Sequence, residues 1–188
     1  FGSAVERLRF SGARRGAPTP KRLGLQLGRI VPARCAAYAQ AFEVRRACRL
    51  TEPTPPLIEQ FLGRLGQRFD RPASFYIFGG SALLLLGGPR NTGDVDFTFV
   101  IETEMADPFR QAIEAVGKEM GLDLEESDPA EFMPLPAGAE GRHRRIGRFG
   151  RIDAYIFDLY SIALMKLDRA FPADVEDVHY LIRAGYIE

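Results

Sequence analysis

The hydrophobic positions after Leu50 change their spacing several times along the chain, and each change predicts an element. A first helix is predicted to start at Thr54-Pro55-Pro56, because threonine is a favourable N-cap and proline fits the first helical turn. Apolar residues then recur at helical spacing, at Leu57, Ile58, Phe61, Leu62, Leu65 and Phe69. The short apolar run Phe75–Phe78 predicts a buried strand, which Gly79-Gly80 ends.

A short helix and a second strand are expected next. Ser81 can cap a helix that runs to Leu86. Residues 87–93 contain glycine, proline and asparagine, which are typical of a loop. The second strand is expected at Asp94–Ile101, with Val95, Phe97 and Phe99 as packing residues.

The rest of the chain continues to alternate helices and strands. A helix opens at Asp107-Pro108 and ends near Gly121. A short strand and an acidic turn are expected within 122–141, a strand or hairpin arm at 142–150, and a third apolar strand at Ile152–Phe157. Two helices follow, at about 161–169 and 173–183. This order predicts an α/β (α+β) domain, with a small mixed central sheet flanked by helices and with C-terminal helices.

Composition narrows the protein class. A length of 188 residues suggests one domain with a real core, and a hydrophobic share of 46% is ordinary for a globular protein. No apolar run approaches the roughly 20 residues that cross a bilayer, so we expect no membrane partner. Cys35 and Cys48 allow one bridge but indicate neither a disulfide framework nor a zinc site. We therefore expect a reducing, cytoplasmic setting.

The formal net charge of zero hides a strong asymmetry. Residues 1–49 contain 11 basic and 2 acidic residues, whereas 50–188 contain 14 basic and 23 acidic ones. We expect residues 1–49 to be a basic segment outside the core fold, and 50–188 to be the folded domain. The first methionine is Met105, so one hypothesis places residues 1–49 upstream of the natural start, with initiation at Leu50. The alternative is a basic arm that binds nucleic acid.

Asp94 and Asp96 are the first candidates for chemistry. Side chains at i and i+2 of a strand share a face, so the two carboxylates repel each other unless a cation lies between them. Carboxylate oxygens are preferred ligands of Mg²⁺, and two ions about 4 Å apart can serve phosphoryl displacement. We expect two Mg²⁺ ions, with Mn²⁺ as a substitute. Asp153 would complete the cluster if its strand lay beside that of Asp94 and Asp96; otherwise all three are solvated strand-end residues.

The double glycine upstream offers an anion site. Glycines let backbone N–H groups approach a phosphate, and Ser81 adds a donor. Arg90 and Thr92, in the loop before the carboxylates, are further candidates for phosphate contact. The alternatives are a tight turn at Gly79-Gly80 without a ligand and an exposed loop cation at Arg90. No Walker-type loop, dinucleotide fingerprint or nucleophile elbow occurs, and the chain has only two histidines.

Together these residues resemble a known pattern. Gly79-Gly80-Ser81, followed about a dozen residues later by Asp94-Val95-Asp96, is similar to the signature of the nucleotidyltransferase superfamily with the polymerase-β-like fold. The resemblance implies a nucleotidyltransferase-like domain over 50–188. It also implies that Asp94 and Asp96 are metal ligands, and that Asp153 is the third carboxylate, acting as metal ligand or as base.

The C-terminal part resembles a bacterial subgroup related to abortive-infection nucleotidyltransferase toxins. The shared positions lie in residues 157–182, at Lys166, Arg169, Asp174 and Asp177. This resemblance implies a catalytic role for Lys166 and a nucleotide-binding role for Asp174. It also implies that a C-terminal piece follows in other members. The alternatives are that Asp174 stabilises a helix N-terminus and that Lys166 is a solvated cation.

The resulting expectation is a Mg²⁺-dependent nucleotidyltransferase. It would transfer a nucleotidyl group from an NTP to a hydroxyl of RNA, such as a tRNA 3′ end, or of a protein. As a toxin, it would pair with a cognate antitoxin. Arginines of the segment 142–151, around His143, form a basic patch where an RNA could dock. The alternatives are an inactive binding or antitoxin-like module with this fold, and a nucleotide-sugar glycosyltransferase.

Overall fold

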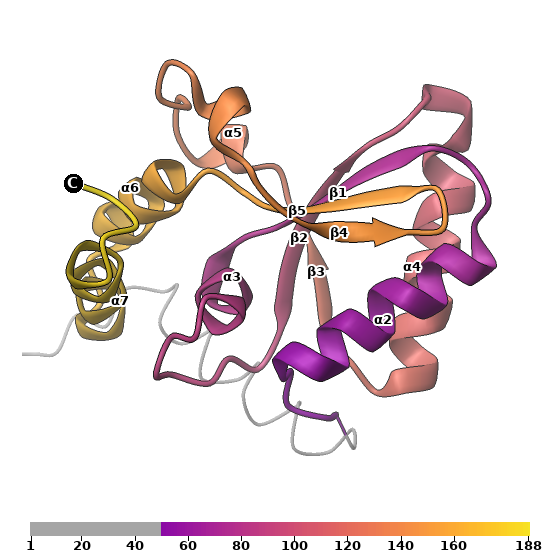
Figure 1. Ribbon diagram of the computed structural model, residues 1–188, viewed down its shortest axis with the longest axis horizontal. Coiled ribbons are helices and arrows are strands. Elements are labelled where there is room, and N and C mark those ends of the chain that lie inside the picture. The colour runs from indigo at the N-terminus through magenta and orange to yellow at the C-terminus, as the bar shows by residue number, and fades with distance from the viewer. Residues whose placement is uncertain (1–49) are drawn as a thin grey trace, which may run out of the picture. The chain divides into compact units, whose positions relative to one another are not determined.

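The computed structural model describes residues 50–188, which form a mixed α/β domain (Figure 1). The hypotheses on residues 1–49 concern a part of the chain outside the described residues. The centre of the domain is a five-stranded sheet with the order β3-β2-β1-β5-β4. Its strands are β1 (Ala73–Ile77), β2 (Val95–Val100), β3 (Leu124–Glu126), β4 (Arg144–Phe149) and β5 (Ile152–Ile156). The sheet is mixed, as predicted, because β1 pairs antiparallel with β2 and parallel with β5.

The longer helices of the described part follow the predicted order, and the short helix α5 (Pro129–Phe132) occupies the segment where an acidic turn was expected. The longer helices are α2 (Pro55–Arg68), α3 (Gly79–Leu85), α4 (Ala106–Met120), α6 (Leu159–Arg169) and α7 (Pro172–Arg183). Two short 3₁₀ helices lie at Thr103–Met105 and Ala139–Arg142. Thr54 caps α2 by accepting a hydrogen bond from the Leu57 amide, and Gly121 ends α4 in the left-handed conformation. Among these described helices, none is long and apolar enough to span a bilayer.

One face of the sheet is buried under α2 and α4. The ring of Phe61 on α2 lies 6.0 Å from that of Phe75 on β1, and the ring of Phe109 on α4 lies 5.1 Å from that of Phe99 on β2. The strands alternate between buried and half-buried residues, so the second face is less covered than the first. Figure 1 shows α2 and α4 together on one side of the sheet, with α6 and α7 away from them.

Three segments meet at one edge of the sheet: the start of α3, the start of α6 and the start of β2. Because β1 and β5 are parallel, α3 and α6, which follow them directly, start at the same edge. The Phe78 amide donates to the carbonyl of Asp96 at 3.1 Å, and the Phe157 amide donates to the carbonyl of Ile77 at 2.8 Å. The start of the antiparallel strand β2 therefore lies beside the double glycine, as a phosphate and metal site would require.

Candidate functional site

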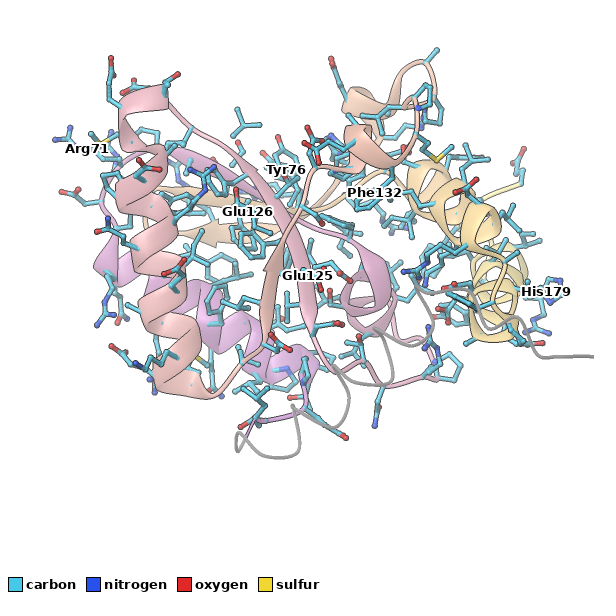
Figure 2. All side chains as sticks on the ribbon, turned by 180° about the vertical axis from the view of Figure 1, so that it is seen from behind. Arg71, Tyr76, Glu125, Glu126, Phe132 and His179 are labelled. Carbon is cyan, nitrogen blue, oxygen red and sulfur yellow. The ribbon has the colours of Figure 1, made fainter. Side chains whose placement is uncertain are left out.

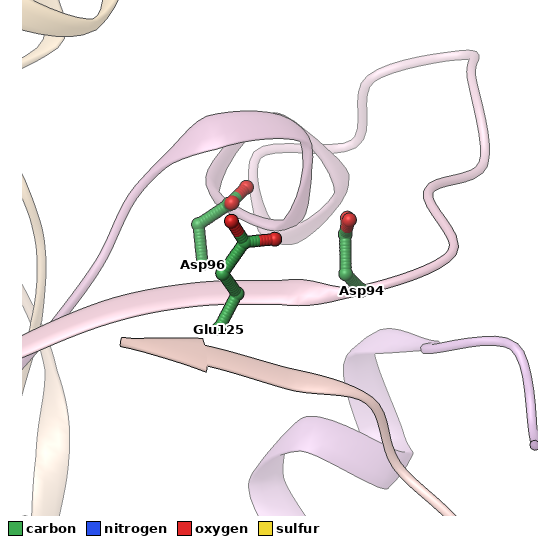
Figure 3. Close-up of side chains that lie close together, drawn as sticks. All are labelled: Asp94, Asp96 and Glu125. Carbon is green, nitrogen blue, oxygen red and sulfur yellow. The ribbon is translucent and has the colours of Figure 1, made fainter. Parts of the chain in front are cut away.

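Three carboxylates meet at this edge of the sheet (Figure 3). Asp96 lies on β2 directly beside Glu125 on β3, and Asp94 precedes Asp96 by two residues on the same face. One carboxylate oxygen from each residue lies within 4.8 Å of the other two. The strand pairing therefore brings together two residues that the sequence marks as a pair and one, Glu125, that it does not.

The double glycine packs directly against this cluster. Gly79 has a φ of +61°, and a Cβ placed on it would lie 1.8 Å from Oδ2 of Asp96. A Cβ on Gly80 would lie 2.8 Å from Oγ1 of Thr92, and that hydroxyl donates a 2.8 Å hydrogen bond to Oδ1 of Asp94. Both glycines are thus required by close approach, and Gly79 also by its left-handed backbone. The turn and the carboxylates form one structural unit.

The electrostatics of the cluster favour a cation. The pKa of Asp96 is raised to about 7, mainly by burial and also by the nearby negative charges of Asp94 and Glu125. The positive charges of Arg169 and Lys166 act against this rise. A half-buried carboxylate beside two others is ionised at neutral pH only at a cost, which a metal ion would remove.

The donor set fits Mg²⁺. The ion takes oxygen ligands at about 2.0–2.1 Å, so two oxygens bound to one ion lie up to about 4.2 Å apart. The oxygens of Asp94, Asp96 and Glu125, all within 4.8 Å of one another, come close to that spacing. Glu125 is exposed, so its side chain is able to adjust and one side of the site is open to solvent. Within residues 50–188, the cluster consists of carboxylates alone, without nitrogen or sulfur ligands, which suits a hard cation.

Asp153 does not join the cluster, which corrects the expected third carboxylate. The expectation required β5 to lie beside β2, but β1 separates them. Asp153 is level with Ser74 on β1, whereas Asp96 is level with Phe78. Four residues of strand correspond to about 13 Å, so the two carboxylates lie toward opposite ends of the sheet. Asp153 instead forms an ion pair with Arg145 at 3.1 Å.

The sequence offers one signal for the strand that carries Glu125. Residues 122–125 read Leu-Asp-Leu-Glu, an alternation of apolar and acidic side chains that is typical of a half-buried strand. Leu122 is buried and Leu124 packs against the core, while Glu125 lies on the face that carries Asp96. The short strand was expected within 122–141, but its neighbour in the sheet was not, and only that neighbour places Glu125 in the site.

Ser81 and Arg90 have internal partners in this structure. Ser81 is fully buried, and its hydroxyl donates a 2.9 Å hydrogen bond to the carbonyl of Phe78. The guanidinium of Arg90 donates two hydrogen bonds to the carboxylate of Asp177 on α7. The hydrogen bond from Arg90 to Asp177 raises the pKa of Arg90. The ion pair therefore holds the loop that contains Arg90, before the carboxylates, against the C-terminal helix α7.

Lys166 is the centre of a buried ion network between α6 and α7. It is 2% exposed, and its Nζ donates to Oδ1 of Asp174 at 3.2 Å and to Oδ2 of Asp177 at 2.7 Å. Burial alone would raise the pKa of Asp177, but hydrogen bonds from Arg90 and Lys166 bring it below its ordinary value. Lys166 is thus a buried, paired cation and not the solvated one that the alternative assumed.

Asp174 keeps one polar atom without a partner. Its Oδ1 accepts hydrogen bonds from Lys166 and from Arg169, the latter at 2.8 Å. Its Oδ2 is buried and has no hydrogen-bond partner among the described residues. Asp174 lies in the first turn of α7, and an unsatisfied buried oxygen at this position costs stability. This network is close enough to the carboxylates for Lys166 and Arg169 to influence the pKa of Asp96.

Residues 57–183 match the family model described as "Nucleotidyltransferase of unknown function (DUF6036)". The chain belongs to this nucleotidyltransferase family. The matched span contains the double glycine, the three carboxylates and the buried network, so the DUF6036 assignment covers the whole candidate site. The narrower resemblance to the toxin subgroup stays a prediction. Neither the curated proteins nor the solved structures contain a match to the chain.

Proposed function

We propose that this DUF6036 protein catalyses Mg²⁺-dependent transfer of a nucleotidyl group from an NTP to a hydroxyl acceptor. The observation that carries the proposal is the carboxylate triad Asp94, Asp96 and Glu125 packed against the Gly79-Gly80 turn. A metal cluster alone serves many chemistries, and a glycine turn alone is a common structural feature. Their direct contact is what a triphosphate with bound Mg²⁺ requires.

Each part of the site has a role in this proposal. Asp94, Asp96 and Glu125 hold the cation, which, when bound, neutralises phosphate charge. The backbone N–H groups at the start of α3 face the phosphates, and Thr92 orients Asp94 through its hydrogen bond. The Ser81 hydroxyl is already used by Phe78, so Ser81 contributes its backbone N–H in this arrangement.

The buried network supplies positive charge beside the phosphates. Arg90 and Arg169, with side chains 47% and 46% exposed, are the accessible cations of the network. Asp177 holds Arg90 and also accepts from Lys166. Lys166 and Asp174 thus act in our proposal by positioning charge for the nucleotide.

The acceptor hydroxyl oxygen forms a bond to the α-phosphorus, the bond to pyrophosphate breaks, and the hydroxyl proton leaves with solvent. Positioning and charge neutralisation supply most of the rate enhancement in such a site.

The experiment measures NTP binding and label transfer together. Wild type, Asp96→Asn and Asp153→Asn are dialysed against each NTP with Mg²⁺, then incubated with α-³²P-labelled NTPs, total RNA and cell lysate. We expect wild type to bind NTP and label an acceptor, Asp153→Asn to bind NTP as wild type does, and Asp96→Asn to lose both activities. The proposal fails if wild type binds no NTP, or if Asp96→Asn labels as well as wild type.

A role as the toxin of a toxin–antitoxin pair is part of the same proposal and follows only from the C-terminal resemblance. Expression of wild type would then arrest growth, and expression of Asp96→Asn would not. Growth arrest that persists in Asp96→Asn would separate toxicity from nucleotidyl transfer.

A further inference from the structure

The sheet face opposite α2 and α4 carries an unusual row of side chains. The central strands β1, β2 and β5 alternate buried with half-buried residues, and apart from Phe99, which packs against α4, the half-buried ones share this face. They are Ser74 and Tyr76 on β1, Asp96 and Thr98 on β2, and Asp153 and Tyr155 on β5. Figure 2 shows Tyr76 and Glu125 on the sheet, between α4 and the α5 segment. We call this surface the open face.

Aromatic rings form the middle of the open face. Tyr76 and Tyr155 lie side by side with their rings stacked, 5.3 Å apart at an interplanar angle of 20°. His143 lies 4.8 Å from the ring of Tyr76, and its Nδ1 has no hydrogen-bond partner among the described residues. Rings of this kind, at half-buried positions, are suited to stack on flat π systems such as nucleobases.

Arginines border the rings. Residues 141–152 contain five arginines and no acidic residue. Arg145 is opposite Tyr155, and Arg148 is opposite Asp153, so both lie on the open face. Asp153 pairs with Arg145, whereas among the described residues Arg148 donates only to the carbonyl of Gly150, at 3.4 Å. The exposed guanidinium of Arg148 is thus available to a phosphate.

The open face is continuous with the carboxylate cluster. Tyr76 pairs with Thr98 on β2, and Asp96 is two residues away on the same face of that strand. Diagonal neighbours across an antiparallel pair are about 7–8 Å apart. If a base stacks on Tyr76, the distance from its sugar to the carboxylate cluster is therefore about the length of one nucleotide.

We propose that the open face binds the 3′ end of a single-stranded RNA and presents its terminal hydroxyl to the carboxylate cluster as the acceptor. This inference rests on the proposed function. The 3′ oxygen would form a bond to the NTP α-phosphorus as the bond to pyrophosphate breaks, and its proton would leave with solvent. Rings for bases and arginines for phosphates match a polynucleotide strand. A serine, threonine or tyrosine in a protein acceptor would need neither.

The test uses a 12-nucleotide RNA with a 5′ fluorescein and a free 3′ hydroxyl, followed by anisotropy. Loss of one stacking ring in Tyr76→Leu should weaken binding about tenfold. In Arg148→Ala, the slope of log K against log salt should fall by about 0.7. Tyr76→Phe, which keeps the ring, should bind as wild type does. Tyr160→Leu, on the exposed part of α6, is the control and should also bind normally.

Binding of NTP with Mg²⁺, measured by dialysis, separates the two proposals and checks that each variant is folded. If wild type binds NTP but not the RNA, or if α-label enters protein and not RNA, the acceptor inference is overturned while the proposed function stands. If wild type binds no NTP, the proposed function itself fails. If Tyr76→Leu and Tyr160→Leu lose RNA binding equally, or neither loses it, the open face is not the acceptor site.

Discussion

The raised pKa of Asp96 makes the proposed metal site testable without any substrate. In the metal-free protein, the pKa of Asp96 is about 7, against an ordinary value of 3.8, because the carboxyl is buried beside Asp94 and Glu125. One pH unit of such a difference corresponds to 1.36 kcal/mol. The ionised carboxylate therefore destabilises the metal-free fold by roughly 4 kcal/mol relative to the protonated form.

The sign of the pH dependence follows directly. The folded pKa is raised, so this contribution to stability is complete below pH 4 and is lost as pH rises through 7. Asp96→Asn removes the charge and keeps the shape. In EDTA, the free energy of unfolding of this variant should exceed that of wild type by an amount that grows about 1.4 kcal/mol per pH unit between pH 4 and pH 7. Above pH 7, the difference should level off at roughly 4 kcal/mol.

Urea denaturation at several pH values, with EDTA or with 10 mM Mg²⁺, measures this difference. Wild type should gain stability from Mg²⁺ at pH 8, since a ligand that binds only the folded state stabilises it, and Asp96→Asn should gain far less. Asp153→Asn is the matched control, because Asp153 lies outside the cluster. The reasoning is refuted if Asp96→Asn is less stable than wild type in EDTA at pH 8, or if the difference does not change with pH.

Three further predictions concern single residues. Gly79→Ala should unfold at lower urea and lose the stabilisation by Mg²⁺, because its Cβ would lie 1.8 Å from the Asp96 carboxylate at a φ of +61°. In the same urea assay, the control Gly63→Ala should gain up to about 1 kcal/mol in free energy of unfolding, because a Cβ there meets nothing within 4 Å. Calorimetric titration with Mn²⁺ should show weaker binding for Glu125→Gln and unchanged binding for Asp153→Asn, and equal loss in both would contradict the assigned triad. Lys166→Met should cost about 3–5 kcal/mol in chemical denaturation, because it leaves two buried carboxylates without their shared cation.

Local patterns in the sequence predict most of the fold. Helical spacing and caps place α2 and α4, and apolar runs place β1 and β5, because these signals depend on neighbouring residues alone. The pair Asp94 and Asp96 was also predictable, since strand alternation puts both on one face. The C-terminal resemblance singled out Lys166 and Asp174, which the structure places in one buried network.

The third carboxylate was not predictable, because it depends on which strands are neighbours. Asp153 and Glu125 both belong to strands that follow β2 in the chain, and either strand could in principle have lain beside it. The sheet order decides for Glu125, by placing β3 next to β2 and β1 between β2 and β5. The partner of Arg90 is equally non-local, since Asp177 follows it by 87 residues.

The position of the transferred phosphate tests the central claim most directly. Wild type is incubated with Mg²⁺, total RNA and lysate, and with the same NTP labelled at either the α or the γ phosphate. Nucleotidyl transfer predicts that α-label enters the acid-insoluble acceptor, while γ-label leaves as pyrophosphate, and that Asp96→Asn abolishes both. Entry of γ-label into the acceptor, or turnover that Asp96→Asn leaves intact, would contradict the account.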